Sequence, residues 1–168
     1  MSDQGFAVLR LEAGDGDVFR DIRLSAFRFA EDSFASSLAE ELAKSMDWFE
    51  TRVQQDAIFV ARDASVILGV VGLSAKAGSK EAHKGFVYSM FVLPEARGRG
   101  VGQALLEALI DEAKARFESV QLIVVSTNAS AVALYRRAGF ESYGMEPRAL
   151  KTAAGVYTDD LLMWKPLR

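Results

Sequence analysis

The stretch RGRGVG, from Arg97 to Gly102, places three glycines and two arginines between an apolar run and a long amphipathic segment. A strand followed by a glycine-rich turn and a helix makes an anion site, because the first amides of a helix lack intrahelical partners. The positive end of the helix dipole favours a phosphate at the same place. Glycine leaves the backbone open to a ligand, and arginine adds positive charge. The loop therefore predicts binding of a phosphate-bearing ligand.

Two familiar phosphate-binding loops do not match this stretch. The dinucleotide fingerprint G-x-G-x-x-G requires a third glycine where Gln103 stands, and the Gly-Lys-Ser/Thr of a P-loop occurs nowhere in the chain. A solvated basic turn that only precedes a core helix is the simpler interpretation of a lone glycine loop. The sequence around the loop has to decide between these interpretations.

A second motif follows the loop at a fixed distance. The loop reads R-x-x-G-x-G, and NASAVALYRRAGF, from Asn128 to Phe140, reads N-x-x-A-x-x-x-Y-x-x-x-G-F. Together the two motifs resemble those of the Gcn5-related N-acetyltransferases, and the likeness in spacing and element order covers roughly residues 59–140. In that family the first motif holds the pyrophosphate of acetyl-CoA.

The resemblance implies transfer of the acetyl group of acetyl-CoA to a primary amine, by direct attack of the amine on the thioester and without a metal. The family splays two parallel strands so that pantetheine lies between them, and backbone amides of one strand polarise the thioester carbonyl. The cofactor-binding residues carried over from the motifs are Met90, Phe91, Val92, Arg97, Gly98, Arg99, Gly100, Val101, Gly102 and Asn128.

Tyr135 matches the tyrosine of the second motif, whose hydroxyl can protonate the departing thiolate. A phenol with its ordinary pKa of about 10 carries that proton at neutral pH. The competing interpretation is that Tyr135 is a packing residue with an exposed tip. Asn128 has two interpretations as well, a contact to the cofactor and a helix N-cap.

The general base is not evident from the sequence. Some relatives carry a glutamate near the start of the central strand, but the corresponding segment here, HKGFVYS, has no carboxylate. The remaining candidates are His83, Tyr88, the pair Glu31 and Asp32, and water alone.

The acceptor pocket of such a fold is shaped by the first two helices, the turn between them and the final hairpin. From Glu31 to Asp56 the chain carries seven Asp or Glu against Lys44 and Arg52, and an acidic rim would attract a cationic amine. Surface helices are commonly charged, which is the simpler explanation. The acceptor can be a small molecule or a peptide or protein amine, and homodimers are common in the family.

The elements that must position these residues follow from periodicity. We expect strands at 6–11, 57–63, 66–77, 85–93 and 120–126, helices at 17–30, 37–55, 100–117 and 130–138, and two final strands around the turn at 153–156. Helix 17–30 is expected to bury Val18, Ile22, Ala26 and Phe29, and helix 37–55 to bury Leu38, Leu42, Met46 and Phe49. This order predicts an α/β (α+β) fold with a single mixed, mostly antiparallel sheet and helices on both faces.

Length and composition limit the classes of protein. The 168 residues suit one domain spanning 1–168, and the net charge of −3 argues against a nucleic-acid binder, although Arg97, Arg99, Arg136 and Arg137 form a local basic group. The absence of cysteine and the single histidine argue against thiolate chemistry and a metal site. With no signal-like N-terminus and no membrane span, we expect a cytoplasmic protein. An acyl-CoA-binding module without activity is the alternative to the enzyme.

Overall fold

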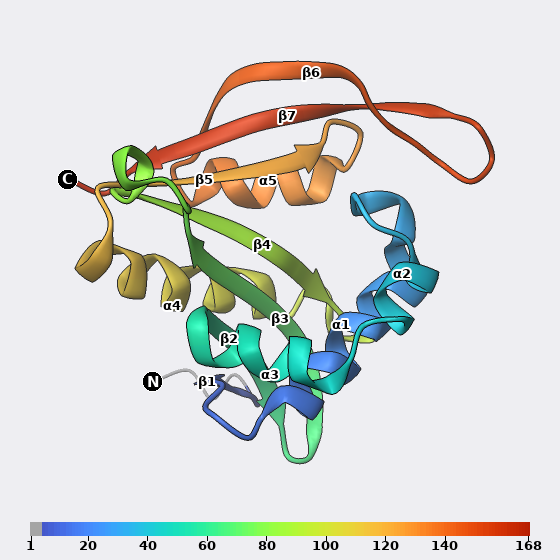
Figure 1. Ribbon diagram of the computed structural model, residues 1–168, viewed down its shortest axis with the longest axis vertical. Coiled ribbons are helices and arrows are strands. Elements are labelled where there is room, and N and C mark those ends of the chain that lie inside the picture. Colours follow the sequence, from blue (N-terminus) through green and yellow to red (C-terminus); the bar gives the residue numbers. More distant parts are fainter. Residues whose placement is uncertain (1–4) are drawn as a thin grey trace.

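A computed structural model of the chain describes residues 5–168 and contains one seven-stranded sheet in the order β1-β2-β3-β4-β5-β7-β6 (Figure 1). The strands are β1 (Ala7–Arg10), β2 (Ala57–Asp63), β3 (Val66–Ala75), β4 (Lys84–Val92), β5 (Ser119–Val125), β6 (Glu141–Lys151) and β7 (Tyr157–Pro166). The helices are α1 (Gly16–Ala30), α2 (Leu38–Leu42), α3 (Met46–Gln55), α4 (Val101–Arg116) and α5 (Ala129–Arg137), with short 3₁₀ turns η1 (Glu31–Ser33), η2 (Ser79–Glu81) and η3 (Pro94–Ala96).

Strands β2, β3 and β4 form an antiparallel meander, and β1 pairs antiparallel with β2 at its edge. Their register is interrupted once between β3 and β4, where Val70 pairs with Phe91 but Gly72 pairs with Tyr88. The extra residue in β4 is accommodated at Ser89, whose φ of 56° lies in the left-handed region. A bulge of this kind bends the strand and redirects the groups that follow it.

Strands β4 and β5 are parallel, and they pair only at their beginnings. Lys84, Gly85 and Phe86 pair with Ser119, Val120 and Gln121, and no pairing between these strands continues beyond them in the part of the chain that the structure describes. On its other side β5 pairs with β7 along its whole length. The sheet therefore opens between β4 and β5 toward the carboxyl ends of both strands.

Helices cover the two faces of the sheet unequally. Helices α1 and α3 pack on one face around Phe19, Phe49 and Ile58, and α4 packs on the other around Leu105 and Leu109. The second apolar cluster also includes α5 and the inner face of β5 and β7, through Val132, Leu122 and Met163. The predicted fold class, a mixed and mostly antiparallel sheet with helices on both faces, is confirmed.

The predicted helix 37–55 is wrong as a single element. The chain leaves the helical path after Leu42, and Ser45 begins α3 by accepting a hydrogen bond from the Trp48 amide through its hydroxyl. Because of this break, Leu42 and Met46 are exposed instead of buried, whereas Phe49 lies in the core as expected. The N-capping serine therefore starts a new helix, although the apolar residues before and after it keep the spacing of a single helix.

The final hairpin, β6 and β7, extends past the end of β5 as a long twisted ribbon (Figure 1). The nearly continuous apolar run of β5 is typical of a strand buried on both faces, but Ile123 is 48% exposed. Among the helices of residues 5–168, none is long and apolar enough to cross a membrane.

Candidate active site

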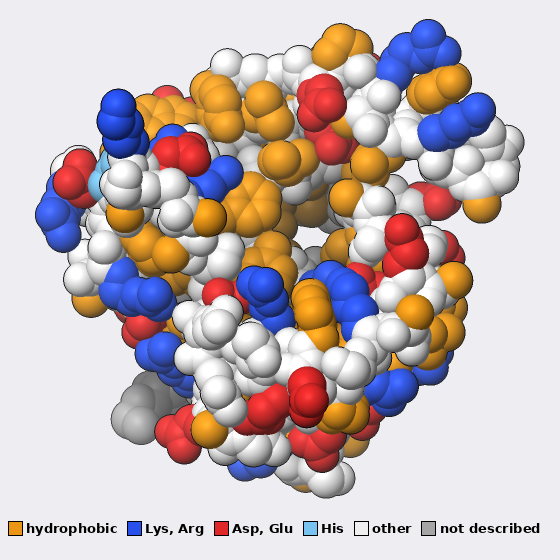
Figure 2. Space-filling model, in the orientation of Figure 1, with side chains coloured by type: hydrophobic (Ala, Val, Ile, Leu, Met, Phe, Trp, Pro, Cys, Tyr) orange, Lys and Arg blue, Asp and Glu red, His pale blue; other side chains and the backbone are white. Residues whose placement is uncertain are grey.

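A groove of about 930 Å³ occupies the opening between β4 and β5 and continues across the end of the sheet. Figure 2 shows the middle of this region as a deep hollow between the helical half of the molecule and the final hairpin. Its walls come from the end of α1 with η1, the end of β4, the glycine loop, the β5–α5 junction and the tip of the hairpin.

Most of the predicted cofactor-binding residues meet in this groove. Its lining includes, in chain order, Met90, Phe91, Val92, Arg97, Gly98, Gly100, Val101, Gly102 and Asn128. The segments that the two motifs mark therefore lie on facing walls of one cleft, as the expected binding of one extended ligand requires.

The three glycines of the loop are needed for different structural reasons. Gly98 and Gly100 adopt φ values of 76° and 80°, and a Cβ at either position would meet no atom within 4 Å. Gly100 is also the N-cap of α4, so its backbone opens into the groove beside the free amides of the helix. Gly102 is a packing glycine, because a Cβ there would lie 3.2 Å from Leu134 and 3.3 Å from Met90. Gly98 and Gly100 therefore supply the open backbone.

The two arginines of the loop diverge. Arg97 lines the groove, and its Nε donates to the Val92 carbonyl oxygen at 3.4 Å. Arg99 is directed elsewhere, because its Nη2 donates to Asp63 Oδ2 at 2.9 Å and to the Gly5 carbonyl oxygen at 3.5 Å. The side chain of Arg99 joins the loop to β2, so a contribution of Arg99 to the cofactor stays a prediction that its side-chain contacts do not favour.

The β4 bulge beside the groove is held by a buried ionic network. Arg23 of α1 donates through Nη1 to the hydroxyl of Ser89, the residue with the left-handed φ. The same guanidinium donates through Nε to Glu41 at 2.6 Å and through Nη2 at 3.0 Å. Sequence reasoning missed this network, because no local pattern shows that Arg23, Glu41 and Ser89 meet.

Asn128 and Tyr135 occupy different environments on α5. Asn128 lines the groove and also caps α5, since its Oδ1 accepts from the Ala131 amide at 3.3 Å. Tyr135 is only 6% exposed and packs edge-to-face on Phe140, with ring centroids 5.8 Å apart. Burial raises the pKa of its hydroxyl, and within residues 5–168 the hydroxyl makes no hydrogen bond. Its role as proton donor stays a prediction.

The base candidates are separated by the fold. His83 is exposed at the closed end of the β4–β5 pair, where its carbonyl oxygen accepts from the Glu118 amide. The Tyr88 hydroxyl donates to Asp56 Oδ2 at 2.6 Å beneath the helices, and burial followed by this bond raises its pKa. Glu31 accepts from the Leu38 amide at 3.2 Å. Only Asp32 of these four lines the groove.

The far end of the groove is formed by α1, η1 and the hairpin, as expected for an acceptor pocket. Phe29, predicted to face the core, is 61% exposed and stacks on Phe91 across the groove wall, with ring centroids 6.4 Å apart. Phe34, Thr152 and Val156 complete this end, with Asp32, Ser33, Ala154 and Thr158 beside them. Phe29 lies in the last turn of α1, which borders the groove, so its ring contacts the groove wall.

The acidic rim counted from the sequence is smaller in the structure. Glu41 and Asp56 are buried, and each is bonded to cationic side chains, Arg23 and Lys44 in one case and Arg52 in the other. These two carboxylates hold the helices together and do not face a ligand. A different carboxylate, Asp160 of β7, is buried near the groove without a partner, and sequence reasoning missed it.

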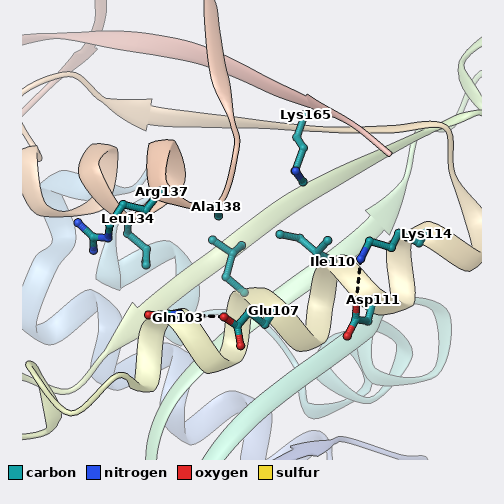
Figure 3. Close-up of a pocket in the computed structure, with 10 residues that line it drawn as sticks. Gln103, Glu107, Ile110, Asp111, Lys114, Leu134, Arg137, Ala138 and Lys165 are labelled. Atoms are coloured by element: carbon teal, nitrogen blue, oxygen red, sulfur yellow. Dashed lines mark hydrogen bonds and ion pairs between the residues drawn. The ribbon is translucent and has the colours of Figure 1, made fainter. Parts of the chain in front are cut away.

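A second cavity of about 460 Å³ lies between α4 and α5 and joins the groove at three shared residues, Gln103, Leu134 and Arg137. Figure 3 shows Arg137 and Lys165 on one side of this cavity, above a row of side chains on α4 that includes Glu107 and Asp111. Within that row Glu107 accepts from Gln103 at 2.8 Å, and Asp111 accepts from Lys114 at 3.1 Å. The groove can therefore extend along α4 and α5 beyond the glycine loop.

Comparison with known proteins places this geometry among acetyltransferases. The sequence model of the Acetyltransferase (GNAT) family matches residues 19–140. The L-methionine sulfoximine/L-methionine sulfone acetyltransferase of Pseudomonas aeruginosa is 38% identical over 114 residues, which are 64% of this chain and 64% of that protein. The chain thus matches somewhat less than two thirds of that relative's length.

Solved structures agree along nearly the whole chain. A GCN5-related N-acetyltransferase from Kribbella flavida superposes with a TM-score of 0.82 at 26% identity, covering 98% of this chain and 99% of that one. The protein yncA from Salmonella typhimurium, described as a putative acetyltransferase with its cofactor acetyl-CoA, superposes with a TM-score of 0.79 at 19% identity, covering 97% and 94%. The second likeness concerns the fold alone.

Proposed function

Because this chain belongs to the GNAT family of acetyltransferases, we propose that it transfers the acetyl group of acetyl-CoA to a primary amine. The observation that carries the proposal is the groove itself. Its opening between β4 and β5 lies next to a loop whose Gly98 and Gly100 leave the backbone open at the start of a helix.

Three parts of the groove divide the work of binding acetyl-CoA. The amides at the start of α4, with Gly98, Gly100 and Arg97, would hold the pyrophosphate. The strand edges left unpaired between β4 and β5 would receive the pantetheine arm, and the backbone around Met90 to Val92 would polarise the thioester carbonyl. Binding of the pyrophosphate, at the other end of acetyl-CoA, then positions the acetyl carbon for attack.

The reaction requires one proton to leave the amine and one to reach the thiolate. Tyr135 matches the motif position for the second transfer, and its raised pKa keeps the hydroxyl protonated at neutral pH. The acceptor would enter at the end formed by Phe29, Phe34 and the hairpin. A small amine such as the one named for the Pseudomonas relative is the first to test, and peptide or protein amines follow.

We further propose that residues 1–168 act as one cytoplasmic domain.

The direct test measures thiol released from acetyl-CoA in the presence of L-methionine sulfoximine, single L-amino acids, spermidine and a peptide with a free N-terminus. We expect turnover with at least one of these amines. Tight binding of acetyl-CoA with no turnover of any of them would favour the acyl-CoA-binding module.

A matched pair of glycine variants tests the place of the cofactor. Gly100→Val fills the open space beside the loop, so calorimetry should show loss of acetyl-CoA binding. Gly14→Val introduces comparable backbone strain, since Gly14 has a φ of 101° and open space around it, but it does not line the groove. Unchanged acetyl-CoA affinity in a folded Gly100→Val protein would show that the loop does not hold the cofactor.

A further inference from the structure

Two polar side-chain atoms on β7 are buried beside the groove without hydrogen-bond partners. In the described part of the chain, Thr158 Oγ1 and Asp160 Oδ1 are the buried side-chain oxygen or nitrogen atoms that make no hydrogen bond. Asp160 is 7% exposed. A buried polar group without a partner costs free energy, and a buried carboxylate costs more, so such groups call for an explanation.

The register of the sheet places both side chains on the face of β7 that borders the groove, and of the two only Thr158 is among the lining residues. Thr158 and Asp160 are two residues apart on one strand, so they lie on the same face, and Thr158 lines the groove. Asp160 is also paired with Val125, which lines the groove at the end of β5. Directly paired residues share a face of the sheet. The carboxyl group of Asp160 therefore lies directly behind this wall of the groove.

The charges around Asp160 are negative. Its partner on β6 is Glu146, and Asp159 is its neighbour in the chain. Burial, followed by the charges of Glu146 and Asp159, raises the pKa of Asp160. The groove itself is lined by one further carboxylate, Asp32, and by two cations, Arg97 and Arg137.

The cations of the hairpin are engaged elsewhere. Arg148 lies over the Tyr157 ring at 3.9 Å, and Lys151 lies 5.3 Å from the same ring. Figure 2 shows acidic side chains on the hairpin above the central hollow and basic side chains at its tip. Neither Arg148 nor Lys151 bonds to Asp160 within residues 5–168, so its carboxylate is available to an ammonium group that enters the groove.

We propose that Asp160 binds the ammonium group of the acceptor and acts as the general base of the acetyl transfer, with Thr158 as a second hydrogen-bonding partner. The inference rests on the proposed function. It supplies the base that none of His83, Tyr88 or Glu31 is placed to provide.

The proton balance is complete with these groups. The ammonium gives one proton to the Asp160 carboxylate, and the free amine attacks the thioester carbonyl carbon, forming the C–N bond. The C–S bond then breaks, and the thiolate receives a proton from Tyr135 or from solvent. The nitrogen loses its second proton to solvent, and solvent returns a proton to Tyr135 where Tyr135 was the donor, so that one net proton is released. The acetylated amine and coenzyme A thiol leave, and Asp160 releases its proton to water.

The first experiment compares Asp160→Asn with Asp159→Asn, using acetyl-CoA and the best amine of the screen. Both changes remove one negative charge from neighbouring positions, but Asp159 points to the other face and accepts from the Arg148 amide at 2.7 Å. Asp160→Asn should lower kcat/KM by about 10²- to 10⁴-fold, with the Kd of acetyl-CoA changed little. Asp159→Asn should stay within a few-fold of the wild type.

The pH profile distinguishes a base from a packing residue. In the wild type, kcat/KM should fall at low pH as Asp160 is protonated, with a midpoint above the ordinary aspartate pKa of 3.8. This limb should be absent from the residual activity of Asp160→Asn and retained in Asp159→Asn. Activity of Asp160→Asn within about three-fold of the wild type, or a large loss confined to Asp32→Asn, would overturn the proposal.

A second measurement does not depend on turnover. The carboxyl carbon of Asp160 is followed by NMR while n-butylammonium chloride is added to the wild-type protein, with Asp160→Asn used to assign the signal and Asp160→Ala in reserve. A saturable shift supports the ammonium site. No shift at high amine concentration overturns it, even if acetyl-CoA turnover is observed. If no amine is acetylated while the shift occurs, the proposed function fails and the ammonium site stands.

Discussion

Glu41 and Asp160 are both buried carboxylates, one in the helical half of the molecule and one in the final hairpin. Glu41, which is fully buried, accepts hydrogen bonds from Arg23, from Lys44 at 2.6 Å and from Ser36 at 2.8 Å. Asp160 accepts none from residues 5–168. Burial by itself raises the pKa of either group, but the bonds to Glu41 outweigh this effect and lower its pKa to about 2. For Asp160 nothing opposes it.

The difference separates a structural carboxylate from one kept available for a ligand. The bonds of Glu41 join α2 to α1, and through Arg23 they reach Ser89 at the β4 bulge. The helical half thus uses its buried charge to fix the wall of the groove. The hairpin leaves its buried charge uncompensated at the acceptor end, and a buried charge without a partner lowers stability.

The largest effect is expected from Tyr135→Phe, which extends the comparison to a buried residue whose hydroxyl makes no hydrogen bond within residues 5–168. If the hydroxyl protonates the leaving thiolate, kcat should fall by about 10²- to 10⁴-fold, while stability and acetyl-CoA affinity change little. Phe140→Leu is the control, because it disturbs the same ring packing without removing a hydroxyl, and it should lower stability and retain kcat. Full activity of Tyr135→Phe, where chemistry limits turnover, would remove Tyr135 from the catalytic residues.

Glu41→Ala should be nearly as damaging, but to stability. It leaves the guanidinium of Arg23 and the ammonium of Lys44 without their carboxylate, and removal of one partner from a buried pair costs about 3–5 kcal/mol. Urea denaturation would measure the loss. Asp160→Asn, the matched variant at the unpaired site, should leave the free energy of unfolding equal or higher. Equal losses of stability in the two variants would contradict the difference between the helical half and the final hairpin.

The pH dependence of stability should have opposite signs at the two sites. The pKa of Glu41 in the folded protein is about 2 against an ordinary value of 4.5, so its contribution is present above pH 4.5 and is lost as the pH falls toward 2. The loss amounts to up to about 3 kcal/mol. Asp160 has a raised pKa, so acidification protonates it and relieves the cost of its burial.

The measurement is a series of denaturation curves from pH 7 to pH 2.5 for the wild type, Glu41→Gln and Asp160→Asn. The difference between the wild type and Glu41→Gln should shrink toward pH 2.5, because the wild-type carboxyl is then partly protonated. Any stability gained by Asp160→Asn at pH 7 should shrink once the pH is below the raised pKa of Asp160. A gap for Glu41→Gln that is constant with pH would contradict the first expectation.

The smallest effect is expected from Tyr88→Phe, which removes one of the two hydrogen-bond partners of the buried carboxylate of Asp56. Asp56 would lose the hydroxyl at 2.6 Å and keep Arg52 at 3.4 Å, so stability should fall by about 1–2 kcal/mol. Tyr157→Phe, at an exposed position, is the control and should stay within about 0.5 kcal/mol. Because the Tyr88 hydroxyl is already engaged, acetyl transfer should persist. If turnover instead slowed by about 10²-fold or more, Tyr88 would return to the base candidates.

Local patterns predicted the elements more reliably than the partners of their side chains. The mostly antiparallel sheet, the glycine loop between β4 and α4, and the cap at Asn128 were all visible in the sequence. The errors at Leu42 and Met46 come from the helix break before Ser45, and the error at Phe29 comes from its place in the last turn of α1. A helical period identifies the side chains that lie on one face, but the position of the neighbouring layer decides how far along the helix that face is covered.

In the candidate site, likewise, the sequence predicted the cofactor end better than the acceptor end. The cofactor end is built from contiguous motifs, so the sequence was sufficient to indicate it, apart from the direction of Arg99, which depends on the position of Asp63 on β2. The acceptor end joins α1, η1 and the hairpin from opposite ends of the chain. Its one usable signal was the pair Asp159 and Asp160 within a strand, because adjacent residues of a strand face opposite ways and one of the two must turn inward.

By itself, therefore, the sequence determined the family, the order of the elements and the loop prepared for a phosphate, because short-range spacing and backbone chemistry decide these features. Only the tertiary structure decided that Glu41 is neutralised, that Ser89 is fixed by Arg23, and that Asp160 is not compensated. The physical reason is that the cost of a buried charge depends on the groups within a few ångströms of it. Those groups come from segments that the register of the sheet and the packing of the helices bring together.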